Sequence, residues 1–152
     1  MKLIRLIALP LLLISPAITS AASINDMQTC QATLNFVVSR LAAPPENYAA
    51  AEVATIKQGL TSYDDYIQRE IITPGLLKFN NNDAARASAM QEQVDAYKAK
   101  VVESYAKRYP HNQLLTDYAI AINNCTKQAM PEGAEMDALK QALLMIVKLA
   151  NR

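Results

Sequence analysis

The stretch DAARASAMQEQVDAYKAKVVESYAKRY, residues 83–109, decides the fold class of this chain. It contains neither glycine nor proline, and Pro110 follows its last residue. Its apolar side chains recur every three or four positions, at Ala87, Met90, Val94, Tyr97, Val101 and Tyr105. This period predicts one amphipathic helix of about seven turns.

The charges at the two ends of this stretch agree with a helix. Asp83 can accept hydrogen bonds from the free backbone amides of the first turn, and Lys107 and Arg108 complement the helix dipole in the last turn. Glu103 precedes Lys107 by four residues and predicts an exposed ion pair. Because a helix this polar on one side cannot bury its apolar stripe alone, we expect other helices to pack against it.

Proline and glycine divide the rest of the chain into further segments of helical period. The breaks fall at Pro44-Pro45, Pro74-Gly75, Pro110 and residues 131–133. They predict helices at residues 24–42, 46–72 and 134–150, and a fourth helix that Asn112 caps and that carries Leu115, Tyr118, Ile122, Cys125 and Ala129 on one face. The fold class expected for residues 23–152 is therefore an all-α bundle of four to five helices in a single domain.

Two details of the second segment are less regular. Gly59 lies in the middle of residues 46–72, and Ser62 with Asp65 has the spacing of a capping box, so the segment is either one helix or two that meet near Gly59. After the Pro-Gly break, Leu76, Leu77 and Phe79 are expected to form an apolar loop across the end of the bundle.

Residues 1–22 have the pattern of a secretory signal peptide. Lys2 and Arg5 precede an apolar run at residues 6–14, and small residues follow at 19–22, which predicts cleavage after Ala21 or Ala22. A permanent membrane anchor is the weaker alternative, because the apolar run is too short to span a bilayer comfortably. The mature protein is therefore expected to be periplasmic or secreted, with no membrane insertion after cleavage.

The charge balance excludes one class of partner. Removing Lys2 and Arg5 leaves 13 basic and 14 acidic side chains, a net charge near −1. A chain this close to neutral has no general attraction for nucleic acid or anionic lipid. We therefore expect no nucleic-acid partner.

Cys30 and Cys125 each fall on the predicted inward face of a helix. Export would place them where disulfides persist, so we predict that they bond to each other and staple the first helix to the fourth. The alternative is two separate buried thiols. Redox catalysis is disfavoured, since the chain has no C-x-x-C pair.

The residues needed for catalysis or for a cofactor are mostly missing. His111 is the single histidine, no C-x-x-C-H motif attaches haem, and the three glycines form no phosphate-binding loop. Asp64 and Asp65 are adjacent, hence about 100° apart on a helix, and are expected on a solvated face, with Asp65 paired to Arg69. We therefore expect no enzyme, no metal and no cofactor.

Tyrosine is the unusual feature of the composition, with seven Tyr, two Phe and no Trp. Tyr105, Tyr109 and His111 lie close together in sequence at one predicted end of the bundle, where they are candidates for a partner-binding surface. The alternative is that these tyrosines lie at the edge of the core with their hydroxyls in water.

The architecture is similar in general shape to several unrelated groups of small exported helical proteins, among them stress chaperones, secretion pilotins, toxin immunity proteins and periplasmic inhibitors. The leading expectation is an exported non-enzymatic protein of inhibitor, immunity or chaperone type that binds another protein. A carrier of a small molecule or haem between helices is the alternative. An unfamiliar enzyme that depends on His111 is a third.

Overall fold

The structure is a computed structural model that describes residues 23–152, and the expected signal peptide at residues 1–22 lies outside them. Within the described residues all regular secondary structure is helical. None of these helices is long and apolar enough to cross a membrane. They are α1 (Ile24–Arg40), α2 (Ala50–Ile67), the π-helix η1 (Gln68–Ile72), α3 (Thr73–Phe79), α4 (Ala84–Arg108), α5 (Thr116–Thr126) and α6 (Gly133–Ala150).

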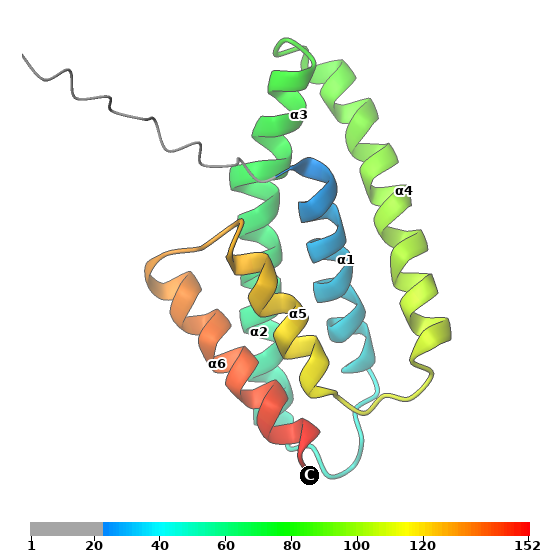
Figure 1. Cartoon of the computed structure of the whole chain (residues 1–152), viewed down its shortest axis with the longest axis vertical. Helices are drawn as coiled ribbons and strands as arrows, with labels where there is room; N and C mark the ends of the chain where they lie inside the picture. Colours follow the sequence, from blue (N-terminus) through cyan, green and yellow to red (C-terminus); the bar gives the residue numbers. More distant parts are fainter. Residues whose placement is uncertain (1–22) are drawn as a thin grey trace, which may run out of the picture.

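The helices form a bundle of five rods, which confirms the predicted fold class. Helices α2, η1 and α3 follow one another without interruption and make one long rod. In Figure 1, α1 lies between α5 and α4, with α6 on the far side of α5. Contacts join α1 to α2, α4 and α5, and join α6 to α2 and α5. Because α1 has neighbours on three sides, it is buried nearly all round, including its polar Gln28 and Gln31.

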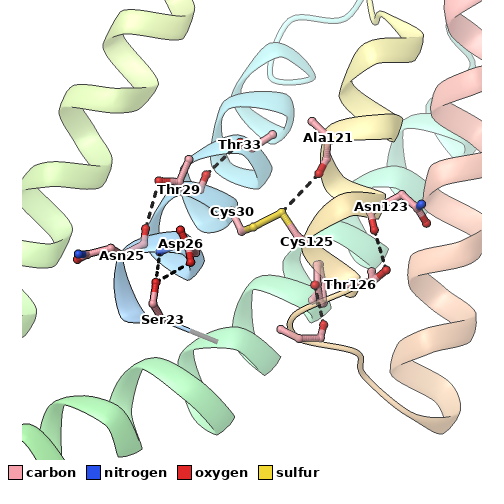
Figure 2. Close-up of a disulfide and its surroundings, with 12 residues drawn as sticks. Ser23, Asn25, Asp26, Thr29, Cys30, Thr33, Ala121, Asn123, Cys125 and Thr126 are labelled. Atoms are coloured by element: carbon pink, nitrogen blue, oxygen red, sulfur yellow. Dashed lines mark hydrogen bonds between the residues drawn. A yellow bond between two sulfur atoms is a disulfide. The ribbon is translucent and has the colours of Figure 1, made fainter. Parts of the chain in front are cut away.

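The predicted disulfide between Cys30 and Cys125 is present and joins α1 to α5. Both residues are buried, with exposed fractions of 8% and 6%. Figure 2 shows the bond between the middle of α1 and the end of α5. The Cys125 sulfur also lies 3.5 Å from the carbonyl oxygen of Ala121, but a disulfide sulfur carries no proton to donate.

Pro74 and Gly75 do not end the second helix, so the prediction of an apolar loop after them is wrong. The Thr73 amide bonds to the carbonyl of Gln68, five residues back, and this wide π-turn directly precedes Pro74. A π-turn gives room to a proline ring that would collide with the preceding turn of a regular α-helix. Leu76 is buried in α3, whereas Phe79 at its end is 72% exposed.

Gly59 does not break α2, so the alternative of two helices is also wrong. The residue is buried where α2 crosses α6. A Cβ atom at this position would overlap the carbonyl oxygen of Ala138 and lie 2.6 Å from the Cβ of Ala142. Gly59 therefore allows α2 and α6 to approach closely, although glycine has a low helix propensity.

Helix α4 has the expected ends but not the expected central position. The Arg86 amide donates to Asp83 Oδ1 at 3.1 Å, and Lys107 pairs with Glu103 at 2.7 Å, as predicted. However, the main contacts of α4 are with α1 and α3, and Ala87 and Val94 are its only buried residues. Tyr97, expected on the inward stripe, is 47% exposed. The helix that predicts the fold class thus lies at the edge of the bundle, and α1 is its centre.

The predicted cap of the fourth helix is wrong as well. Helix α5 begins at Thr116 without a side-chain cap. The Asn112 side chain instead donates to the Ala43 carbonyl at 2.9 Å and accepts from Arg40 at 3.3 Å. Asn112 therefore ties the loop between α4 and α5 to the end of α1.

The end of α6 is tied to the start of α2 through Glu52. Its carboxylate accepts hydrogen bonds from Arg152 at 2.7 and 2.9 Å and from Lys148 at 2.9 Å. These bonds lower the pKa of Glu52 to about 2, and those from Arg152 have the largest effect. This contact joins the end of the chain to the helix against which α6 packs.

Three of the seven tyrosines hold loops. Tyr63 and Tyr66 donate to the carbonyls of Ala129 and Met130, at 2.7 and 2.9 Å, and the hydroxyl of Tyr48 accepts from the Leu114 amide at 3.0 Å. Each bond satisfies a backbone group in a connection between helices. The hydroxyls therefore account for tyrosine rather than phenylalanine at these positions.

Candidate functional site

An aromatic cluster lies where α1, α4 and α5 meet, and Phe36 is its centre. The ring of Phe36 packs edge-on against Tyr105 and Tyr118, with centroids 5.6 Å apart in both pairs, and lies 6.1 Å from Tyr109. Tyr109 and Tyr118 also meet edge-on at 5.8 Å. Such spacings are favourable for aromatic pairs. The cluster brings Phe36 of α1 together with three tyrosines that lie far from it in sequence, at residues 105–118.

Two adjacent hollows open over this cluster, and together we call them the tyrosine groove. The larger hollow has a volume of about 240 Å³ and the smaller about 160 Å³. Both are lined by Arg108, Tyr109 and Tyr118. The larger is completed by Thr33, Phe36, Tyr105, Asp117 and Ala121, and the smaller by Pro110, His111, Gln113 and Leu115.

The three residues predicted as a partner surface all line this groove. Tyr105 lines the larger hollow, His111 lines the smaller, and Tyr109 lines both. The two tyrosines also fit the alternative prediction, because each is partly buried against Phe36 at the edge of the core. The sequence did not identify Phe36 or Tyr118 as groove residues: Tyr118 was expected on the apolar face of its helix, and Phe36 was assigned no role.

Unpaired charges lie at the rim of the groove. Among the described residues, neither Arg108 nor Asp117 belongs to an ion pair. Arg40 lies over the face of Phe36, 4.8 Å from the ring centroid, as in a cation–π contact. Its Nε atom is buried and has no hydrogen-bond partner within the described residues.

Tyr118 carries a second unsatisfied group in the same place. Its hydroxyl is buried and finds no partner among the described residues. Burial raises the pKa of Tyr118, Tyr109 adds to the rise, and the positive charge of Arg40 opposes it. The hydroxyl therefore remains a neutral donor and acceptor at ordinary pH.

A separate polar network crosses the interface between α1, the long rod and α4. Gln31 donates to Gln68 at 3.2 Å, Gln68 donates to Gln91 at 2.8 Å, and Gln91 donates to Asp95 at 3.0 Å. Asp95 in turn pairs with Lys98 at 2.8 Å. Neutral amides thus hold α4 to its neighbours where its apolar contact is thin.

Asp64 lies beside this network, which corrects the prediction that it belongs to a solvated face. Asp65 is exposed, but Asp64 is half-buried and its Oδ1 has no partner among the described residues. Burial raises the pKa of Asp64 to about 6; Lys98 opposes the rise, while Asp65 and Asp95 add to it. The Oε1 of Gln31 is also an unsatisfied acceptor, and the Gln31 amide nitrogen lies 3.4 Å from the backbone carbonyl of Asp64.

The predicted pair of Asp65 with Arg69 does not form. Arg69 instead bonds to Glu70 at 2.7 Å and to Glu135 at 3.1 Å. The second of these contacts links the long rod to the start of α6. The Arg69 side chain therefore pairs with its sequence neighbour and with a residue of another helix, and not with Asp65.

Replacing Asp64 with Asn should stabilise the protein above pH 6. Since the pKa of Asp64 is higher in the folded protein than the ordinary 3.8, the folded state binds this proton more tightly than the unfolded chain. The free energy of unfolding therefore falls as pH rises from about 4 to about 6, by about 2 kcal/mol after allowance for partial exposure. Urea unfolding should show Asp64→Asn about 2 kcal/mol more stable than the parent at pH 8 and equal to it below pH 4.

Asp65→Asn is the matched control, because it changes the net charge equally at an exposed neighbouring position. It should shift the free energy of unfolding by less than about 0.5 kcal/mol at either pH. An advantage of Asp64→Asn that is the same at pH 4 and pH 8 would show that burial of the charge is not its cause.

Neither metal-ligand clusters among the described residues nor similarity to known proteins indicates a function for the groove. Within residues 23–152, no group of three or more His, Cys, Asp or Glu side chains is placed to hold a metal ion. Comparison of the chain with protein families, curated proteins and solved structures found no match. The function must therefore be argued from the groove itself.

Proposed function

We propose that this is an exported, non-enzymatic protein that binds another protein through the tyrosine groove, as an inhibitor, an immunity factor or a chaperone. The observation that carries the proposal is the groove, in which Tyr105 and Tyr109 are partly exposed above a buried aromatic floor. Tyrosine is favoured at recognition surfaces because a rigid ring offers contact area at low entropic cost while its hydroxyl still bonds to water or to a partner.

Taken singly, each hollow of the tyrosine groove is better sized for one side chain of a protein partner than for a carried small molecule. Sites for drug-sized ligands usually enclose 300–1,000 Å³. The larger hollow, about 240 Å³, is smaller than this and open, and it suits one bulky side chain of a partner. A small-molecule or haem carrier is the competing function, and it predicts a ligand that copurifies with the protein.

Two features support export. The disulfide between Cys30 and Cys125 is of a kind that persists in oxidising compartments. Residues 1–22, outside the described part of the chain, have the composition of a signal peptide. Together these two features support a periplasmic or secreted location.

Capture from the envelope fraction of the source organism tests the proposal. The oxidised protein should retain a defined protein partner, and Tyr109→Ala should reduce the amount captured at least ten-fold, because this ring lines both hollows. Tyr97→Ala is the matched control, since Tyr97 is an exposed tyrosine of α4, the helix that ends just before Tyr109, and it lines neither hollow.

Two outcomes would contradict the proposal. If Tyr109→Ala, Tyr97→Ala and the parent capture equal amounts of partner, the groove takes no part in binding it. A preparation that binds no protein but shows a Soret band, or extra mass in a native spectrum, would favour the carrier instead. Circular dichroism of both variants establishes that each is folded.

A further inference from the structure

The two hollows of the tyrosine groove differ in charge. The smaller hollow is lined by Arg108, His111 and Gln113, and no acidic residue lines it. The larger hollow has an aromatic floor, and its rim carries both Arg108 and Asp117. An anionic group is therefore favoured in the smaller hollow and an apolar group in the larger.

The start of α5 adds to the preference for an anion. Leu115 lines the smaller hollow and occupies the N-cap position of α5, where it offers no side-chain acceptor to the free amides of the first turn. These amides are the positive end of the helix dipole. Asp117 offsets part of this field, but it lines only the larger hollow.

An independent observation at the same place is the unsatisfied hydroxyl of Tyr118. This residue is only 5% exposed and lines both hollows, and its hydroxyl has no partner within the described residues. A buried donor without a partner is costly, so this hydroxyl is an unmet hydrogen-bond donor beside the two hollows.

We infer that the groove recognises an extended segment of the partner protein in which a bulky apolar side chain and a carboxylate lie two residues apart. The apolar side chain enters the larger hollow, and the carboxylate enters the smaller one, next to Arg108. This inference rests on the proposed function and adds the chemistry of the segment that is bound.

The spacing follows from the geometry of the cluster. Arg108, Tyr109 and Tyr118 line both hollows, so the hollows are adjacent and share one wall. In an extended chain, side chains two residues apart share a face and are separated by roughly 7 Å. Side chains two residues apart are therefore the closest pair on one face of an extended segment that can enter two adjacent hollows.

Selection from a random peptide library tests the inference. The protein, expressed with its full sequence and purified in its oxidised form, is used to select from a library of 12-residue peptides displayed on phage. The enriched peptides should contain a Phe, Leu, Ile or Met two residues from an Asp or Glu. A synthetic peptide of this kind should bind at least about ten-fold more tightly than the same peptide with Gln in place of the acid.

A pair of variants then assigns the carboxylate to Arg108. Arg108→Gln should weaken binding of the acidic peptide about ten-fold and leave binding of the Gln peptide unchanged. The effects of changing Arg108 and of changing the peptide's acid are then not additive. Lys107→Gln is the matched control, because Lys107 is the exposed neighbour of Arg108, lines neither hollow and changes the net charge equally. It should change either affinity less than two-fold.

The inference is overturned if the library yields no enriched peptide, if the enriched peptides are basic or neutral, or if Arg108→Gln and Lys107→Gln have the same effect. These results leave the proposed function intact as long as capture of a whole protein still depends on Tyr109. If capture no longer depends on Tyr109, both the proposed function and this inference fail. The failure of the inference alone is therefore distinguishable from the failure of both.

Discussion

Replacing both Cys30 and Cys125 with Ser is expected to lower the free energy of unfolding by about 3–4 kcal/mol. The disulfide joins residues 95 positions apart, and the chain-entropy account assigns a loop of this length about 4.7 kcal/mol, an upper figure. For a domain of this size, the loss corresponds to a fall in melting temperature of about 10–20 °C. Urea and thermal unfolding monitored by circular dichroism measure both quantities.

Reduction of the unmodified protein provides the control for this double variant. With a thiol reductant present, the parent should unfold at the same urea concentration as the variant, because both then lack the same covalent link. The variant should also show a steeper dependence on urea, since its unfolded chain is more expanded. A free energy of unfolding within 1 kcal/mol of the oxidised parent would mean that packing between α1 and α5 is sufficient without the bond.

Replacing Gly59 with Val should destabilise the protein by about 3 kcal/mol. At this position even a Cβ would overlap the carbonyl of Ala138 and press on the Cβ of Ala142, and both neighbours belong to α6. A backbone carbonyl cannot turn aside as a flexible side chain does, so α2 and α6 would have to separate. Chemical denaturation of the Gly59→Val and Gly59→Ala variants measures the effect, and Gly59→Ala should lose about 2 kcal/mol.

Ala54→Gly separates this steric effect from helix propensity. Ala54 is an exposed residue of α2, and its replacement with Gly should cost about 1 kcal/mol from propensity alone. By propensity Gly59→Ala would gain the same amount, so a measured loss isolates the collision with α6. A gain in stability for Gly59→Ala would show that α6 moves aside at little cost.

Sequence patterns predicted the features that depend on local rules. Most of the helix positions follow from the period of 3.6, and the pairing of Cys30 with Cys125 follows because only two cysteines are present, both on inward faces. The failures occurred where tertiary contact overrides a local rule. Pro74 follows a π-turn, Gly59 is set by the approach of α6, and Asn112 bonds to the end of α1 rather than to its own helix.

Only part of the groove could be predicted from the sequence, because the rest of it also depends on tertiary contacts. Tyr105, Tyr109 and His111 lie within seven residues of one another, so sequence alone could group them. Phe36 and Tyr118 come from α1 and α5, and only the packing of these helices against α4 brings them to the same place. The half-buried position of Asp64 likewise depends on α1 and α4, which no local pattern reveals.

The position of the disulfide also bears on the order in which the protein folds. Residues 30–125 form a covalent ring, and α6 follows it as a tail that must return to α2 inside the ring. Along the backbone, Gly59 and Ala138 are separated by roughly 80 residues, but the path through the two sulfur atoms is only about half as long. Halving a path reduces the entropy lost in closing it by about 0.6 kcal/mol at room temperature. Oxidation therefore favours early pairing of α6, which lies outside the ring, with α2, which belongs to it, and the unbridged chain must close the same contact over a longer path.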